Sequence, residues 1–583
     1  MAEDKYQKVL ELAKRRGFFW PSYEIYGGVA GFYDMGPYGI LLKNRIIEKW
    51  RQYFVRDHSN YVIEIESPII GPSKVYEASG HVENFTDPIV ECTKCGRKFR
   101  ADHLIKDKLG IDVEGLSPRE MTRIIKENNI KCPVCGGELG EVKTFNLLFK
   151  THIGPYEGNI GYFRPELAQG MFVAFKRVYE VMRSRMPLGI AQVGRVGRNE
   201  ISPRQAMMRL REFTIMEMEY FIDPEDNEKS CPFFERQAST KIRILPYKYK
   251  VEERDPEEVT VREAVEEKLI LHPCLGYWMA VSNEFITSLG IPRNEIYFEE
   301  KGPHERAHYS SQTFDQLVRV SRWGWVEVSG HSYRGDYDLS RHMQHSGQDL
   351  TVFKPFDEPK IVEKTRYIAD KSYIGRTFRS EAKKVFELLA NIPEEELKNA
   401  YLQKKPLKVG EYEIPPNAIL EYKTREKITG KKYIPHVIEP SFGVERVTYV
   451  VFEHAYREKE GRIILSLPRD IAPVQAVVLP LIEKDDDLRK TALEIYDSLR
   501  RAGYYVLYDD SGSIGRRYAR YDEIGVPAAI TVDYQTLEDN TVTLRDRDSW
   551  HQVRIPIASI IDILRKFIYS GEEIDKLGTP INA

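Results

Sequence analysis

The sequence predicts an α+β protein that ends in a separate, small α/β domain. Two strand-like segments, 189–194 and 213–221, flank a loop that carries five arginines between residues 195 and 211. From residue 471 onward strands and helices alternate regularly, which is typical of an α/β domain. Two charged, loosely patterned stretches, 224–272 and 357–432, are interpreted as insertions. The second also fits an accessory subdomain.

Length and composition restrict the class of protein. The chain has 583 residues, 42% of them hydrophobic and 30% charged, which is enough for several domains with large cores. No apolar run approaches the roughly 20 residues of a membrane span. The first residues are charged, so we expect a cytoplasmic protein that does not enter a membrane. With a net charge of −3, any nucleic-acid surface must be a local basic patch.

The N-terminal part combines two amphipathic patterns with a glycine-rich run. Residues 6–16 have helical spacing, whereas the glycine-rich run 27–39 is not expected to form a regular element. A helix with a broad apolar face follows over 40–55, and residues 61–67 form a strand that ends at Pro68. On periodicity alone, the helix fits a dimer seam and an ordinary core helix equally well.

The cysteine spacing predicts a metal site. Four of the six cysteines form two Cys-x-x-Cys pairs: Cys92, Cys95, Cys132 and Cys135. Two such turns can supply four thiolates to one tetrahedral structural zinc ion. Residues 101–129, between the pairs, are expected to be largely helical. Cys231 and Cys274 lack such partners and are interpreted as packing residues.

The middle of the chain supplies further elements and two isolated histidines. We expect a helix over 171–186 with Pro187 as its stop, and a short apolar strand that runs into a polar loop over 325–338. His342 and His345 lie three residues apart. Because no third ligand accompanies them, polar packing is favoured over a metal site.

Two segments predict anion binding. The arginine-rich loop would aim several guanidinium groups at one spot, and these groups match phosphate oxygens in pairs, so we expect a polyphosphate there. No P-loop is present, so side chains would have to bind it. The alternative is a surface hairpin with solvated charges. Gly443 and Arg446 lie just before an apolar helix expected over 447–454, and a glycine and an arginine at a helix start also suit an anion.

The C-terminal α/β domain begins near 466–470. Its β-α-β-α-β order predicts a mainly parallel sheet. The helix expected over 515–524 carries Arg516, Arg517 and Arg520. These arginines give it a cationic edge suited to a nucleic-acid backbone, although a solvated surface helix has the same pattern.

Together these segments resemble the class II aminoacyl-tRNA synthetases, in particular the dimeric, single-chain glycyl-tRNA synthetases. The helix and strand ending at Pro68 are similar to the first motif of that class, 198–213 to the second, and 442–446 to the third. Signatures of the glycyl enzymes are matched at 27–34, 78–81, 164–170 and 436–446. The resemblance covers nearly the whole chain, although only part of the family carries a four-cysteine insertion.

The resemblance implies a domain plan and an activity. An antiparallel-sheet catalytic domain with insertions would span 1–465, with the zinc-knuckle insertion at about 90–140, and an anticodon-binding α/β domain would span 466–583. The implied activity is ATP-dependent attachment of glycine to tRNA(Gly) through glycyl-adenylate, by a homodimer that uses Mg²⁺ and a structural Zn²⁺. Arg516, Arg517 and Arg520 would bind tRNA.

The resemblance also implies roles for individual residues. Arg198 would hold the α-phosphate and the incoming carboxylate, and Glu200 would accept from the adenine amino group. Phe213 would stack on the adenine ring, and Arg446 would either cover its other face or grip the γ-phosphate. Arg198, Glu200 and Arg446 are the expected catalytic residues. Glu327 would bind magnesium. The expected ATP-binding residues are Arg198, Asn199, Glu200, Met208, Arg209, Leu210, Arg211, Glu212, Phe213, Glu327, Val328, Gly443 and Arg446. The expected glycine-binding residues are Arg100, Glu166, Phe213, Glu217, Glu439, Ser441 and Gly443. Arg195, Arg204 and Arg211 receive no individual role.

Other functions fit parts of the sequence. A synthetase for proline, threonine or histidine shares the class motifs. A non-catalytic paralogue would be expected to lose Arg198, Glu200 or Arg446, and all three are present. A zinc-ribbon RNA-binding protein would explain the cysteines but not the arginine-rich hairpin.

Overall fold

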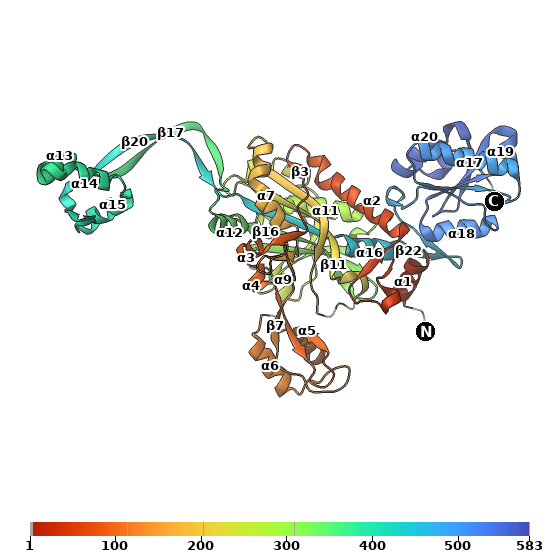
Figure 1. Cartoon of the computed structure of the whole chain (residues 1–583). Coiled ribbons are helices and arrows are strands. Elements are labelled where there is room, and N and C mark those ends of the chain that lie inside the picture. Colours follow the sequence, from red (N-terminus) through yellow and green to blue (C-terminus); the bar gives the residue numbers. More distant parts are fainter. Residues whose placement is uncertain (1–3, 114, 202, 204, 308, 582–583) are drawn as a thin grey trace. The chain divides into compact units, whose positions relative to one another are not determined.

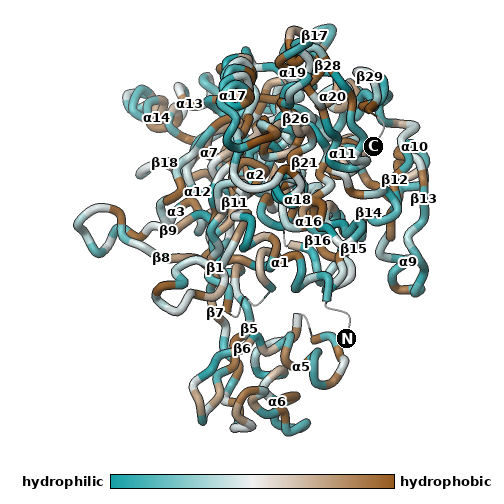
Figure 2. The backbone as a smooth tube through the Cα atoms, turned by 90° about the vertical axis from the view of Figure 1, so that its right-hand side faces the viewer, coloured by the Kyte–Doolittle hydropathy of each residue, from teal (hydrophilic) through white to brown (hydrophobic). Residues whose placement is uncertain are grey.

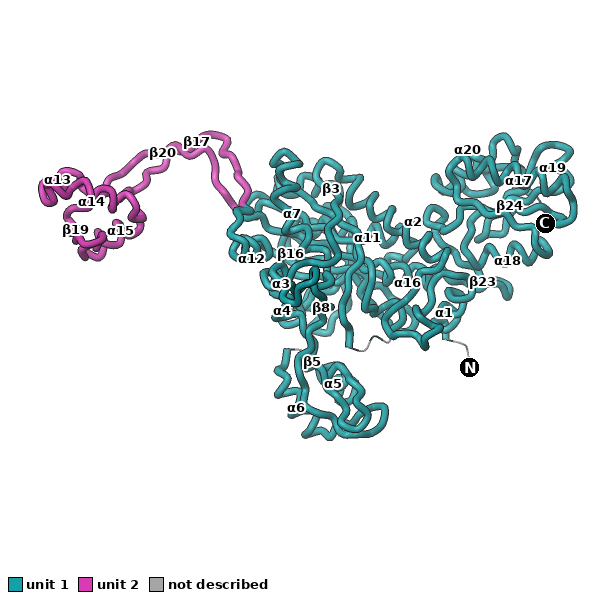
Figure 3. The backbone as a smooth tube through the Cα atoms, viewed as in Figure 1, with its two compact units in different colours: residues 1–350, 434–583 teal, residues 351–433 magenta. Residues whose placement is uncertain are grey.

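The computed structural model describes residues 4–113, 115–201, 203, 205–307 and 309–581 (Figure 1). These residues form two compact units, one of 1–350 with 434–583 and one of 351–433 (Figure 3). In the described part of the chain, no helix has the length and hydropathy needed to cross a membrane.

A nine-stranded sheet lies at the centre of the larger unit, in the order β13-β12-β14-β15-β16-β21-β11-β10-β3. All neighbours are antiparallel except β12 with β14 and β10 with β3. This sheet confirms the predicted α+β class. The strands are β3 (Val62–Glu64), β10 (Leu188–Gly197), β11 (Glu212–Ile222), β12 (Lys241–Leu245), β13 (Glu257–Thr260), β14 (Ile296–Glu300), β15 (Gln312–Val320), β16 (Gly324–Gly335) and β21 (His436–Gly443).

Strand β11 separates the hydrophobic core from the opposite face of the sheet. Its even-numbered residues, such as Met216 and Met218, join a core with α2 (Pro37–Phe54), α11 (Pro273–Ser288) and α16 (Val444–Ala455). Its odd-numbered residues point to the other face, because successive side chains of a strand alternate. On that face Phe221 packs against the aromatic rings of α7 (Ala168–Val181).

The four cysteines belong to a small subdomain with its own core. The subdomain's three-stranded sheet has the order β6-β5-β7, and two helices between the cysteine pairs pack into a core that also contains Cys92 and Cys132. Its elements are β5 (Thr86–Glu91), β6 (Lys98–Arg100), α5 (Ala101–Leu109), α6 (Pro118–Glu127) and β7 (Lys143–Asn146).

The smaller unit is a long two-stranded ribbon with a helical end. Strand β17 (Val352–Ala369) pairs with β20 (Ile419–Tyr433), and most of their side chains are exposed. Because both faces of the ribbon meet solvent, its sequence lacks apolar alternation, so the stretch 357–432 resembled irregular chain. The ribbon leads to a core formed by α13 (Lys371–Phe378), α14 (Ala382–Leu389), α15 (Glu394–Gln403), β18 (Leu407–Val409) and β19 (Tyr412–Ile414).

The C-terminal domain contains a six-stranded sheet in the order β25-β24-β26-β27-β28-β29. The first three strands are parallel and the others join antiparallel, so the prediction of a mainly parallel sheet is wrong. Helix α17 (Asp486–Arg501) is amphipathic, and its polar and apolar residues can be followed in Figure 2. The other elements are β24 (Ala476–Pro480), β25 (Val506–Tyr508), α18 (Ile514–Ile524), β26 (Ala528–Val532), α19 (Tyr534–Asp539), β27 (Thr541–Asp546), β28 (Gln552–Pro556), α20 (Ile560–Tyr569) and β29 (Thr579–Pro580).

Three local predictions need correction. Helix α7 ends at Val181 and not at residue 186, because Arg183 and Ser184 have φ of 57° and 53°, outside the helical range. The polar residues after Trp325 extend strand β16 to Gly335 and do not form a loop. The glycine-rich run contains a short strand, β2 (Tyr33–Met35), paired with β1 (Phe19–Pro21).

The two histidines lie on α12 (Tyr337–Ser346). His342 is buried, with its Nε2 2.8 Å from Oε1 of Gln169, whereas His345 is exposed. This pairing agrees with polar packing.

Candidate active site

A cavity of about 400 Å³ lies on the face of the central sheet opposite the core helices. The strands β11, β16 and β21, the arginine-rich loop and the edge of the cysteine subdomain surround it. It brings together fifteen of the residues predicted for ATP and glycine: Arg100, Glu166, Arg198, Glu200, Met208, Arg209, Leu210, Phe213, Glu217, Glu327, Val328, Glu439, Ser441, Gly443 and Arg446.

Three residues predicted to bind ATP do not line this cavity: Asn199, Arg211 and Glu212. The Arg211 guanidinium donates to the carbonyl oxygens of Ala30 and Glu200, so it joins two backbone segments. Glu212 forms an ion pair of 2.7 Å with Arg195, an arginine without a predicted role. Arg204 lies outside the described residues.

The structure also adds lining residues that the motifs did not indicate. Phe85 and Asp87 come from the cysteine subdomain, and Tyr309 precedes β15. Burial raises the pKa of Asp87 to about 6, with Arg100 opposing this and Glu200 adding to it. Only the position of the cysteine subdomain beside the arginine-rich loop brings Phe85 and Asp87 to the cavity, so no local pattern reveals them.

Arg198 lies between two aromatic rings at one end of the cavity. Its guanidinium carbon is 5.6 Å from the ring centre of Phe85 and 5.5 Å from that of Phe213. Its Nε donates to the carbonyl oxygen of Pro165 over 3.1 Å. These contacts fix the plane of the guanidinium, and a planar guanidinium can bind two oxygens of a phosphate or carboxylate.

Arg446 and Glu327 form a second charged pair. Arg446 Nη1 donates to the carbonyl oxygen of Glu327 over 2.7 Å and lies 3.3 Å from its carboxylate. The Glu327 side chain is 44% exposed, so desolvation opposes its ionisation only in part. Arg446, Lys301 and Arg198 outweigh that effect and hold the pKa of Glu327 below its usual value. An ionised carboxylate is a suitable ligand for Mg²⁺, which prefers oxygen atoms.

An acidic cluster occupies the other end of the cavity around one guanidinium. Arg334 is almost fully buried, and its Nη1 donates to Glu439 over 2.7 Å while its Nε donates to Asp338 over 2.9 Å. The third nitrogen, Nη2, lies 3.8 Å from Glu166 Oε1. Arg334 was not predicted, because it belongs to the segment interpreted as a loop.

The carboxylates of this cluster have different environments. Burial would raise the pKa of Glu166, but His81 and Arg334 outweigh it and hold that pKa well below the usual value. Burial raises the pKa of Glu217, whose two oxygens accept from Ser441 Oγ over 2.6 Å and from the backbone N–H of Leu167 over 2.8 Å. The cavity therefore has arginines at one end and buried carboxylates at the other.

One buried ion pair joins the three segments that resemble the class motifs. Lys43 Nζ, on α2, donates over 2.6 Å both to Glu445 Oε1 on α16 and to Thr214 Oγ1 on β11. Glu445 Oε2 accepts from the backbone N–H of Thr214 over 2.7 Å. Since Thr214 follows Phe213 and Glu445 precedes Arg446, the cluster sets the spacing of these two cavity residues.

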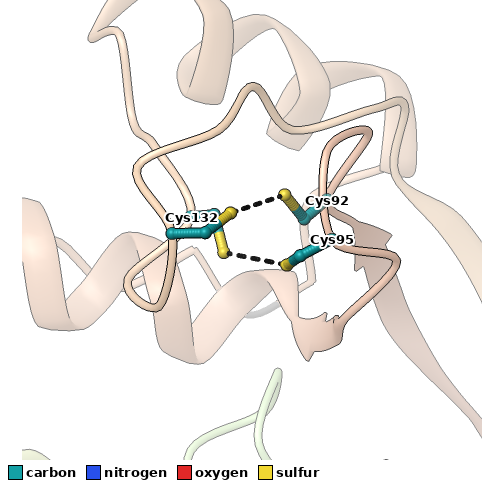
Figure 4. A group of neighbouring side chains, drawn as sticks. Cys92, Cys95 and Cys132 are labelled. Carbon is teal, nitrogen blue, oxygen red and sulfur yellow. Dashed lines mark hydrogen bonds between the residues drawn. The ribbon is translucent and has the colours of Figure 1, made fainter.

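The four paired cysteines converge at one point (Figure 4). Sγ of Cys92 is 3.5 Å from that of Cys135, and Sγ of Cys95 is 3.8 Å from that of Cys132. A tetrahedral zinc ion with Zn–S bonds of about 2.3 Å requires sulfurs about 3.8 Å apart, so the cluster fits zinc. Cys231 and Cys274 are buried in the hydrophobic core.

The basic helix α18 offers less charge to a nucleic acid than its sequence suggests. Arg517 is buried and donates to the carbonyl oxygens of Pro480, Leu481 and Asp509, so its prediction as a tRNA-binding residue is wrong. Arg520 is half-buried and pairs with the Asp509 carboxylate. Of the three predicted arginines, Arg516 alone is exposed.

Comparison with known proteins agrees with this architecture. Residues 475–567 match the family described as "Anticodon binding domain". A prolyl-tRNA synthetase crystal structure from Cryptosporidium parvum, complexed with L-proline and AMP, superposes with a TM-score of 0.51, covering 99% of this chain and 78% of that one. At 14% identity, this likeness supports a shared fold alone.

The similarity in sequence is much closer for two other proteins. A protein of Aeropyrum pernix named glycine–tRNA ligase is 65% identical over 582 residues and matches over 100% of both chains. The glycine–tRNA ligase of Pyrococcus horikoshii is 46% identical over 570 residues, covering 97% of this chain and 99% of that protein. The resemblance seen in the sequence is thereby confirmed, and the chain belongs to the family of the glycine–tRNA ligases.

Proposed function

We propose that this chain joins glycine to tRNA in two steps, with ATP as the energy source. The observation that carries the proposal is the separation of charge within one cavity. Arginines at one end suit the phosphates of ATP, and buried carboxylates at the other suit the ammonium group of an amino acid. Residues 1–465 would form the catalytic domain and 466–583 the anticodon-binding domain.

In the first step, a carboxylate oxygen of glycine bonds to the α-phosphorus of ATP. The bond from that phosphorus to the pyrophosphate oxygen breaks, which yields glycyl-adenylate and pyrophosphate. Both reactants are anions, so the enzyme must supply positive charge and correct positions. Arg198 holds the α-phosphate and the carboxylate, and Arg209 binds the outer phosphates. Glu327 would hold Mg²⁺, which when bound supplies positive charge beside the pyrophosphate.

The adenine ring would lie between Phe213 and Arg446. Glu200 would accept a hydrogen bond from the adenine amino group. A site between an aromatic ring and a guanidinium favours the binding of a flat, electron-rich ring such as adenine. Stacking of a base on an aromatic side chain contributes about 1–3 kcal/mol to binding.

Glycine would be selected by charge and by size. Its ammonium group would contact Glu166, Glu217 and Glu439, and Ser441 would lie against its α-carbon. A larger amino acid would have to place a methyl group in a packed wall, at a cost of about 1–3 kcal/mol. Because every competitor is larger than glycine, size exclusion is sufficient.

In the second step, the terminal ribose hydroxyl of tRNA attacks the glycyl carbonyl carbon, and AMP leaves. A phosphate oxygen of the adenylate would accept the hydroxyl proton. Arg516 on α18 would bind the tRNA backbone. The remaining proposals are a structural zinc ion on the four cysteines, a homodimer, and a cytoplasmic location.

The test of the proposal is glycine-dependent exchange of pyrophosphate into ATP. We expect exchange with glycine and none with alanine, proline, threonine or histidine. Exchange with one of these amino acids in place of glycine would contradict the proposal.

Replacing Arg198 tests the cationic end of the cavity. We expect Arg198→Ala to lower exchange by at least about 100-fold, since a lost charged contact in the transition state costs about 2.7–4 kcal/mol. Binding of tRNA without glycine should stay nearly intact. Arg195→Ala, on the same hairpin but outside the cavity, is the matched control and should keep exchange. Equal loss of exchange and tRNA binding would indicate misfolding instead.

Replacing Lys43 tests the buried ion pair. Lys43→Met leaves Glu445 without its cation, so we expect a loss of about 3–5 kcal/mol of stability, seen as a lower thermal midpoint. Because Phe213 and Arg446 lose their fixed spacing, KM for ATP should rise about five- to tenfold, with KM for glycine changed less than about twofold. Asp522→Asn breaks a buried pair with Arg545 in the C-terminal domain, 2.9 Å apart, and should leave both KM values unchanged. An equal rise in both KM values for Lys43→Met would refute the positioning role.

The cysteine cluster predicts a metal content that can be counted. Atomic emission should find one zinc ion per chain of the wild type. In Cys132→Ser we expect the zinc to be lost, and the amides of the cysteine subdomain to lose their protection against hydrogen exchange. Cys231→Ser, outside the cluster, should retain the zinc. A metal-free wild type with a protected subdomain would show that the four thiols need no ion.

The burial of Arg517 changes the expected effect of mutations in α18. Arg516→Ala should weaken tRNA binding and reduce the slope of log K against log salt by about 0.7–0.9, the effect of one lost phosphate contact. Arg517→Met should instead lower the thermal midpoint, because three carbonyl oxygens lose their donor. Arg501→Ala, an exposed arginine on α17, is the control. An unchanged slope for Arg516→Ala would remove this residue from the tRNA surface.

A further inference from the structure

Glu219 is a buried carboxyl group directly behind the acidic end of the cavity. It lies two residues after Glu217 on β11, so both side chains point to the same face of the sheet. Glu217 pairs with Ser441 and Tyr220 with Ile438, and this register places Glu219 opposite Glu439. Carboxylate oxygens of Glu217, Glu219 and Glu439 all lie within 4.8 Å of one another.

No hydrogen-bond donor among the described residues contacts the carboxyl group of Glu219. Its exposed fraction is 0%, and within the described residues neither of its oxygens has a hydrogen-bond partner. The nearest cation, Arg334, uses its nitrogens on Asp338 and Glu439. An isolated buried carboxylate costs several kcal/mol, and two like charges directly opposite each other in a sheet repel. Burial, with Glu439 adding to it, raises the pKa of Glu219 well above its usual value.

We propose that Glu219 remains a neutral carboxylic acid and donates its O–H to Glu439, as a positioning residue for glycine binding. The choice of acceptor follows from the hydrogen bonds. Both oxygens of Glu217 already accept hydrogen bonds, whereas Glu439 accepts from Arg334 through Oε1. The inference rests on the proposed role of Glu439 in binding the ammonium group.

The proton on Glu219 would keep Glu439 ionised. Burial raises the pKa of Glu439 well above its usual value, with Arg334 opposing this, so Glu439 needs donors to retain its charge. A hydrogen bond to a charged acceptor contributes more than one between neutral groups. A neutral Glu219 supplies that donor without adding a second negative charge. The charged and titratable groups that face the pair from neighbouring elements are Glu166, Glu217, Tyr309, Arg334 and Asp338. His81 faces Glu166 in turn.

The proton can be observed directly. Infrared difference spectroscopy of the full-length protein should show the carbonyl band of a protonated carboxylic acid, shifted in D₂O and absent from Glu219→Gln. The band should persist across the pH range in which the protein is active. A spectrum without a band that depends on Glu219 would overturn the proposal.

Kinetics separates positioning from simple packing. Glu219→Gln keeps a donor of the same shape, so KM for glycine should stay within about threefold of wild type. Glu219→Leu removes the donor, and we expect KM for glycine to rise at least about tenfold while KM for ATP stays within about twofold. Glu453→Leu is a matched control, since Glu453 is also a buried glutamate, on α16 and bonded to Tyr449. It should lower the thermal midpoint without a selective change in KM for glycine. Equal kinetics for the two Glu219 variants would refute the role.

Titration calorimetry distinguishes a failure of this inference from a failure of the proposed function. Glycine binding to the wild type should release no proton, so its heat should be the same in buffers of different ionisation enthalpy. Release of a proton that is lost in Glu219→Gln would mean that Glu219 ionises on binding, which contradicts a permanently neutral carboxyl. No heat and no exchange with glycine would instead refute the proposed function.

Discussion

The buried pair of Lys43 and Glu445 is the contact on which the geometry of the cavity depends. It joins a helix, a sheet strand and a second helix from distant parts of the chain, with Thr214 as the third member. Burying two charges is costly, so the pair is stable only because each polar atom is satisfied by the other segments. The pair therefore favours one relative position of α2, β11 and α16, and that position sets the distance between Phe213 and Arg446.

Strand β11 shows how one sequence serves both the core and the cavity. From Met216 to Ile222 its even-numbered residues are apolar or aromatic and face the core helices, while its odd-numbered residues include Phe213, Glu217 and Glu219. A shift of one residue would exchange the two sets, placing carboxylates in the core. The cost of such a shift fixes the register, and the register in turn places Glu217 beside Ser441.

The class motifs predicted most of the residues around the cavity, because each motif is a short run that supplies several neighbouring side chains to it. They did not predict Lys43, Arg334 or Glu219, since a single charged residue in an apolar or aromatic run does not reveal whether it is buried. Lys43 and Arg334 are buried against partners that lie more than 100 residues away along the chain. Lys43 contacts Glu445, and Arg334 contacts Glu439. The error at Arg517 has the same origin. A helix surface pattern shows spacing, but not which carbonyl groups of neighbouring strands are left without a donor.

The two ends of the cavity place opposite requirements on the protein. The phosphate end holds arginines that need anions, and in the structure their guanidinium groups contact aromatic rings, carbonyl oxygens and Glu327. The glycine end holds carboxylates that need positive charge beside them. Arg334 would supply part of it, and a proton on Glu219 would remove one of the negative charges. Each end is therefore only partly compensated before substrates bind. A small zwitterion and a polyphosphate supply the missing charges together, so a substrate that offers only one of them leaves the other end of the cavity unsatisfied.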